Sequence, residues 1–127
     1  MRQPCEIGPA RQSIKGVTQI VLTHGHSDHL GDTLDIARTN GATVTTNYEL
    51  GMWLASKGLE KFNPMNTGGT TDLGGFTVTL VRADHSSGDI VDGTPIYLGN
   101  PCGLIIKAKR EPATKVLVPE KGKAVSL

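Results

Sequence analysis

The sequence is poor in cysteine, in aromatic residues and in net charge. Its 127 residues include two cysteines, 4% aromatic residues, and 13 basic against 12 acidic side chains. Two cysteines are too few for a disulfide framework, and no apolar run approaches the roughly 18 residues that a membrane span needs. The balanced charge argues against nucleic-acid binding through bulk electrostatics. We therefore expect a globular protein with no membrane span and no nucleic-acid partner.

The first residues lack the apolar segment of a secretory signal. Residues 1–6 read MRQPCE, and no apolar stretch follows them closely. We therefore expect a cytoplasmic protein whose two thiols, Cys5 and Cys102, are reduced. A disulfide between them, or a thiol nucleophile, is the alternative interpretation.

Strand and helix patterns alternate over the first half of the chain. β-branched apolar runs indicate strands, and polar caps followed by residues at helical spacing indicate helices. We expect a strand over Val17–Thr23, a helix from Asp32 to Asn40, a strand over Ala42–Thr46, and a helix that Asn47 caps and Lys57–Gly58 ends. This alternation is typical of an α/β fold with some parallel pairing.

The second half of the chain has the pattern of antiparallel strands. Two alternating segments flank Gly74-Gly75, which is a two-residue hairpin signal. We expect strands over Thr70–Leu73, Phe76–Val81, Ile96–Leu98 and Leu104–Ile106, and a last short strand over Val116–Val118. No repeat or linker interrupts the sequence, so residues 1–127 are interpreted as one α/β domain with a mixed sheet.

A cluster of histidines follows the first expected strand directly. Residues 24–29 read HGHSDH, so three of the four histidines lie within six residues. Imidazole and carboxylate groups suit zinc and similar divalent ions. His24 and His26 are two apart and can chelate one ion from an extended segment. Asp28 and His29 point away from that pair and can serve a second ion.

The fourth histidine, His85, also follows an expected strand. Alone it would be interpreted as a hydrogen-bonded structural histidine. With the cluster present, it is the natural third ligand for the ion held by His24 and His26. Three imidazoles and a water form an open, catalytic type of zinc site, in which the pKa of the water falls to about 7. A non-catalytic metal site remains the main alternative.

Residues 24–29 resemble the HxHxDH signature of the metallo-β-lactamase superfamily. The flanking segments VTQIVLTHGHSDHLGDT, NPMNTGGTTDLGGFTVTLVRADHSS and IYLGNPCGLII are similar to the UPF0173 group of metal-dependent hydrolases. That group is related to the ascorbate-6-phosphate lactonases. The likeness extends over residues 13–106, whereas residues 107–127 diverge.

The resemblance implies an αββα sandwich with a metal site at one edge of its sheets. By position, His24, His26 and His85 would bind the first ion, and Asp28 and His29 the second. The cofactor would be one or two Zn²⁺ ions, or Mn²⁺ or another divalent metal. Asp28 is also the expected catalytic residue. A hydroxide held by the metal would attack an ester, a lactone or a phosphoester of a small-molecule substrate.

The sequence also departs from this family pattern. Members of the group are nearly twice as long and carry a bridging Asp and a further His in their second half. No Asp or His occurs in residues 107–127. Asp72, Asp89 and Asp92 are the remaining candidates to complete the second site, but no motif supports them.

The short length leads to three hypotheses about function. The first is a metal-dependent hydrolase, the second is a weak or inactive metal-binding or interaction module, and the third is a phosphodiesterase or nuclease. A chain with about half of the sandwich would expose an apolar sheet face or an open edge. We therefore also expect self-association, most simply as a homodimer.

Overall fold

The computed structural model describes residues 14–109, which form three helices and eight strands. In chain order these elements are β1 (Gln19–Val21), α1 (Ser27–Leu30), α2 (Thr33–Asn40), β2 (Thr43–Asn47), α3 (Tyr48–Ser56), β3 (Phe62–Met65), β4 (Thr70–Asp72), β5 (Phe76–Arg82), β6 (Gly88–Val91), β7 (Thr94–Tyr97) and β8 (Cys102–Ala108). The expected mixed α/β class is confirmed. The strand expected over Val116–Val118 and Cys5 lie outside the described residues.

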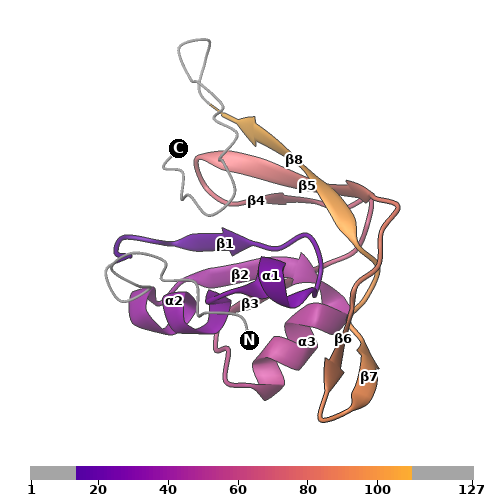
Figure 1. Cartoon of the computed structure of the whole chain (residues 1–127). Helices are drawn as coiled ribbons and strands as arrows, with labels where there is room; N and C mark the ends of the chain where they lie inside the picture. Colours follow the sequence, from indigo (N-terminus) through magenta and orange to yellow (C-terminus); the bar gives the residue numbers. More distant parts are fainter. Residues whose placement is uncertain (1–13, 110–127) are drawn as a thin grey trace.

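The strands form two three-stranded sheets and a separate hairpin. The first sheet is parallel, in the order β1-β2-β3, and the second is antiparallel, in the order β4-β5-β8. Figure 1 shows the two sheets stacked, with α2 and α3 on the outer side of the parallel sheet and the β6–β7 hairpin beside α3. The described residues thus supply three successive layers of an αββα arrangement: helices, parallel sheet and antiparallel sheet.

Side-chain alternation along β1 divides the apolar residues between two cores. Ile20 packs into the cluster between the parallel sheet and the helices, where Val44 and Leu50 are fully buried. Val21, the next residue, packs into the cluster that contains Val78 and Leu80 of the antiparallel sheet. This alternation is the two-residue period of a strand covered on both faces. β1 is therefore packed on both faces up to the turn that carries His24.

The helix signals in the sequence are confirmed in part. Asn47 caps α3 as expected, and its Oδ1 accepts a hydrogen bond from the Leu50 amide at 2.9 Å. Asp32 occupies the N-cap position of α2, but its side chain makes no capping hydrogen bond. The short helix α1 was not expected, and Gly31, with φ of +47°, separates it from α2. Left-handed backbone of this kind favours glycine.

Two strands were missed by the sequence interpretation. β3 contains Pro64, which cannot donate to a ladder, and it lies at the edge of its sheet, where proline is tolerated. β6 begins with Gly88 and Asp89, which are poor strand formers, and its pairing with β7 forms it. The hairpin around Gly74-Gly75 is confirmed, with Asp72 opposite Thr77. None of the described helices is long and apolar enough to cross a membrane.

Candidate metal centre

Three histidines from two separate segments meet at the carboxyl end of β1. His24 lies in the turn after β1, His26 precedes the first residue of α1, and His85 lies between β5 and β6. One potential ligand atom of each lies within 4.8 Å of those of the others. The structure therefore brings together the three side chains that the sequence assigned to one ion. Within residues 14–109, this is the group of His, Cys, Asp or Glu side chains placed to hold a metal.

The three imidazole rings contact one another edge to face. The ring centroids of His24 and His26 are 4.7 Å apart, and those of His24 and His85 are also 4.7 Å apart. The centroids of His26 and His85 are 5.0 Å apart. At these distances the three rings are close enough for their nitrogen atoms to share one ion, and the neutral imidazole is the form that binds metals.

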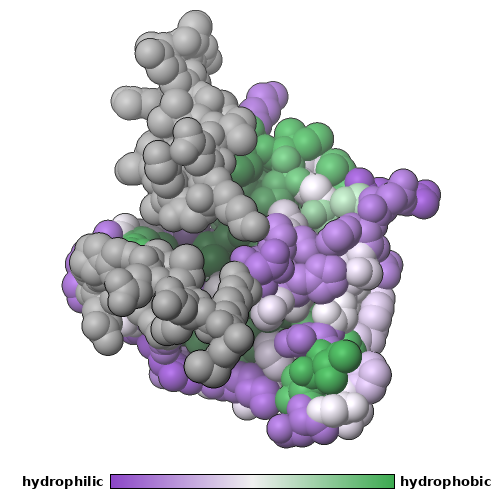
Figure 2. Space-filling view, viewed as in Figure 1, coloured by the Kyte–Doolittle hydropathy of each residue, from purple (hydrophilic) through white to green (hydrophobic). Residues whose placement is uncertain are grey.

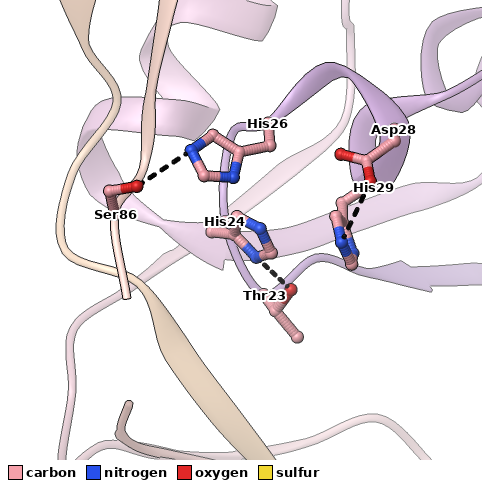
Figure 3. A network of polar contacts seen from close by, with 6 residues as sticks. All are labelled: Thr23, His24, His26, Asp28, His29 and Ser86. Carbon is pink, nitrogen blue, oxygen red and sulfur yellow. Dashed lines mark hydrogen bonds and ion pairs between the residues drawn. The ribbon is translucent and has the colours of Figure 1, made fainter. Parts of the chain in front are cut away.

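His24 is the best-defined ligand candidate, because its environment leaves one ring nitrogen without a partner. Its residue surface is 6% exposed. Figure 3 shows its Nδ1 atom facing Thr23 Oγ1, at 2.7 Å. Its Nε2 atom is buried and has no hydrogen-bond partner among the described residues. A buried nitrogen without a hydrogen-bond partner costs folding free energy. A metal ion bound to this nitrogen would remove that cost. The Thr23 hydroxyl would then accept a hydrogen bond from His24 Nδ1–H and fix the ring orientation.

Burial keeps His24 in the neutral form. Desolvation is the largest influence lowering the pKa of His24 below its ordinary value, and the neighbouring rings of His29, His26 and His85 lower it further. The carboxylate of Asp28 opposes this by raising the pKa. The net depression leaves the Nε2 lone pair available for a metal at neutral pH.

The residues expected to hold a second ion lie next to the first group. Asp28 and His29 are in α1, and Figure 3 shows their side chains facing one another. His29 Nε2 lies 3.6 Å from Asp28 Oδ2. The ring of His29 is centred 4.2 Å from that of His24. Both side chains are about half exposed, at 49% and 51%. They remain candidate ligands for a second ion, and that role stays a prediction.

The three other aspartates considered for the second site have different surroundings. Asp72 binds Lys109 Nζ at 2.6 Å and the Gly74 amide at 2.9 Å, and these contacts lower the pKa of its carboxyl group. Asp89 accepts a hydrogen bond from the Ile90 amide at 2.8 Å. Asp92 lies at the β6–β7 turn with φ of +51°. The structure therefore does not bring these aspartates into the three-histidine group.

Two serines next to His85 contribute contacts that the sequence did not reveal. Ser86 Oγ lies 3.1 Å from His26 Nε2 (Figure 3), and Ser87 Oγ bonds the amide of Gly25 at 2.9 Å. No local signal identifies a contact between residues 62 positions apart.

Cys102 is a buried free thiol beside the same turn. Its Sγ lies 3.3 Å from the Thr23 carbonyl oxygen, and burial raises the pKa of the thiol. A buried thiol of raised pKa is a poor nucleophile. The structure thus gives no support for the alternative of a thiol nucleophile at this position.

Comparison with known proteins places this geometry in a family. The family described as the beta-lactamase superfamily domain matches residues 1–116. The chain belongs to this superfamily. The predicted resemblance, and the fold that it implied, are confirmed by this match and by the layered sheets.

Superfamily relatives with similar sequences carry the description UPF0173 metal-dependent hydrolase. One from Methylobacterium nodulans is 59% identical over 100 residues, which cover 79% of this chain and 42% of the relative. One from Azorhizobium caulinodans is 54% identical, covering 83% of this chain and 46% of the relative. The chain thus spans less than half the length of these relatives.

A solved structure has a similar backbone. It is Igni18, described as a novel metallo hydrolase from the archaeon Ignicoccus hospitalis. The TM-score is 0.59 and the sequence identity is 35%, over 72% of this chain and 37% of the other. The match supports the three-layer arrangement over the matched part of this chain.

Proposed function

We propose that this chain carries the first zinc site of a metal-dependent hydrolase, with the ion held by His24, His26 and His85. The observation that carries the proposal is the unpartnered, buried Nε2 atom of His24, which faces a group of imidazoles. Nitrogen ligands suit zinc, and a site with three protein ligands retains an open position for water or substrate. Relatives described as metal-dependent hydrolases add support.

The proposed chemistry is hydrolysis of an ester, a lactone or a phosphoester in a small molecule. A bound divalent ion supplies a water nucleophile of lowered pKa and polarises the bond that is cleaved. With a metal on Nε2, the Thr23 hydroxyl would accept a hydrogen bond from His24 Nδ1–H, and Ser86 contacts His26, so these hydroxyls would orient two of the rings. Asp28, half exposed and 3.6 Å from His29 Nε2, would accept a proton or help to hold a second ion.

Metal content is the first test of this proposal. Protein purified without chelator should contain about one zinc per chain, because the described residues form one three-histidine group. Elemental analysis of the purified protein measures the ratio. Two equivalents would show that the second site is completed, with Asp28 and His29 as its first candidates. A chain without bound metal, even after incubation with Zn²⁺, would contradict the proposal.

A second candidate function is a metal-binding module without turnover. It is favoured by the incomplete second site, for which we identify two candidate ligands, Asp28 and His29. Assays with a lactone, a carboxyl ester and bis-p-nitrophenyl phosphate separate the two functions. The hydrolase shows zinc-dependent turnover of at least one of them, whereas the module binds zinc and cleaves none.

We also propose that the chain self-associates through its exposed sheet edges. Within the described residues, β8 pairs with β5 on one side only. The outward face of this sheet is more polar than expected. Thr70 and Thr79 lie on it, and their hydroxyl groups are 2.7 Å apart. Ile105 on the same face is 54% exposed, and Ile90 of the hairpin is 67% exposed. Figure 2 shows apolar surface over both regions.

Sedimentation velocity tests the proposed self-association. We expect a dimer at micromolar concentration, because an unpaired strand edge beside exposed apolar residues favours association. Replacing Ile105 by Lys adds charge to the β8 face and should shift the population toward monomer. A monodisperse monomer of the unmodified chain at all concentrations would contradict the expectation.

A further inference from the structure

We propose that Ser87 is a positioning residue that fixes the histidine loop, defined here as residues 24–26, against the segment that carries His85. The proposal rests on the metal centre proposed above and adds a residue to its machinery. Ser87 touches neither the imidazoles nor a reacting atom. Its role is to set the separation of the two segments that supply the three ligands.

The hydroxyl of Ser87 makes two hydrogen bonds in opposite senses. Its Oγ accepts a bond from the Gly25 amide at 2.9 Å and donates to the Leu98 carbonyl oxygen at 3.1 Å. The residue is only 6% exposed. A buried hydroxyl with both its acceptor and its donor satisfied is strongly fixed in orientation. The Gly25 amide lies between the two histidines of the loop. Because Ser87 lies outside the loop, this hydrogen bond holds the loop backbone from outside.

Leu98 provides the rigid surface on which this contact is built. The Leu98 amide donates to the Ser87 carbonyl oxygen at 2.9 Å, so the two residues are joined by two hydrogen bonds. Leu98 is 1% exposed and belongs to the core beneath the parallel sheet. A Cβ atom on Gly25 would lie only 2.5 Å from Leu98 Cδ1. The loop backbone is thus seated directly on a core side chain, and only glycine allows this approach.

Residues 85–87 act on the centre at three successive positions. His85 supplies a ligand, Ser86 contacts the ring of His26, and Ser87 holds the backbone between His24 and His26. The two segments come from different sheets, because the loop follows β1 and His85 follows β5. Ligand sets tolerate errors of only about 0.5 Å in position. The hydrogen bond between Ser87 and Gly25 joins the two segments directly and would keep all three ligands in place.

Binding of Co²⁺ to the full chain, followed by visible absorption, tests this role. We expect Ser87→Ala to weaken Co²⁺ binding by roughly tenfold or more, the range seen when supporting contacts of ligands are removed, with a changed absorption band. Ser87→Thr keeps the hydroxyl and should restore binding to within about threefold of the unmodified chain. Thr45→Val is the matched control. It removes a fully buried hydroxyl whose partner is Asn63, and should leave the Co²⁺ affinity unchanged.

The outcomes separate this role from general stabilisation and from the metal centre itself. Unchanged Co²⁺ affinity in Ser87→Ala, or equal weakening in Ser87→Ala and Ser87→Thr, overturns the proposal. If Ser87→Ala does not fold, hydrogen exchange of the Gly25 amide in the unmodified chain decides. Slow exchange supports the hydrogen bond to Ser87, and exchange as fast as that of an open loop overturns it. Failure of the unmodified chain to bind Co²⁺ overturns the proposed function instead.

Discussion

Replacing His24 by alanine is expected to abolish tight zinc binding and to leave the fold intact. Four-ligand structural zinc sites bind with apparent free energies of roughly 10–16 kcal/mol, or about 3 kcal/mol for each ligand. Loss of one imidazole from three should therefore weaken binding by on the order of a hundredfold or more. Isothermal titration of the metal-free protein with Zn²⁺ measures the change.

The control for this prediction is His29→Ala. The ring of His29 is centred 4.2 Å from that of His24, but His29 lies outside the group of three. Its removal should leave the first equivalent of zinc bound with an affinity close to that of the unmodified chain. His26→Ala and His85→Ala should behave like His24→Ala. Zinc binding of unchanged affinity and stoichiometry in His24→Ala or His26→Ala would rule out the assigned ligand set.

The same substitution tests why His24 is buried. In the metal-free protein, its Nε2 atom has no partner among the described residues, and such a group costs about 1–3 kcal/mol. Alanine removes this cost but leaves a small cavity. The two effects oppose each other, so thermal unfolding of the metal-free variant should change little. The zinc-loaded unmodified chain should unfold at a clearly higher temperature, because binding to the folded state alone stabilises it.

The meeting of the three histidines could be predicted from the sequence because its signals are local and dense. His24 and His26 share one short segment after an apolar strand, and His85 follows another strand. Residues at the ends of strands in a layered α/β fold converge at one edge. The cap at Asn47 and the hairpin at Gly74-Gly75 were predictable for a similar reason, since each depends on neighbours within a few positions.

The features that were missed depend on contacts between distant segments. β3 forms despite Pro64 because an edge position tolerates a missing donor, and its edge position is set by pairing with β2. Ser87 and Gly25 are brought together by their packing against Leu98, and no local sequence pattern predicts this contact. α1 is only four residues long, below the length at which periodicity is informative. Propensity and spacing describe these segments one at a time, whereas tertiary packing decides them.

Asn47 makes both a local helix cap and contacts between distant segments, and its replacement by alanine should destabilise the protein strongly. Its Oδ1 caps α3 at the Leu50 amide, at 2.9 Å. Its Nδ2 donates to the carbonyl oxygens of Leu98 at 3.1 Å and of Asn100 at 3.4 Å. The residue is 4% exposed, so water does not replace these bonds. Loss of the cap costs about 1 kcal/mol, and loss of the buried donor contacts about 1–3 kcal/mol more.

Urea unfolding of three chains separates these two contributions. Asn47→Ala should lower the free energy of unfolding by about 2–4 kcal/mol, the sum of both losses. Asn47→Ser retains a capping oxygen but cannot reach the Leu98 and Asn100 carbonyls, so it should recover only about 1 kcal/mol. Equal stability of the serine variant and the unmodified chain would show that the cap alone matters. A loss below about 0.5 kcal/mol in Asn47→Ala, the size of a typical surface substitution, would show that neither contact stabilises the end of β2.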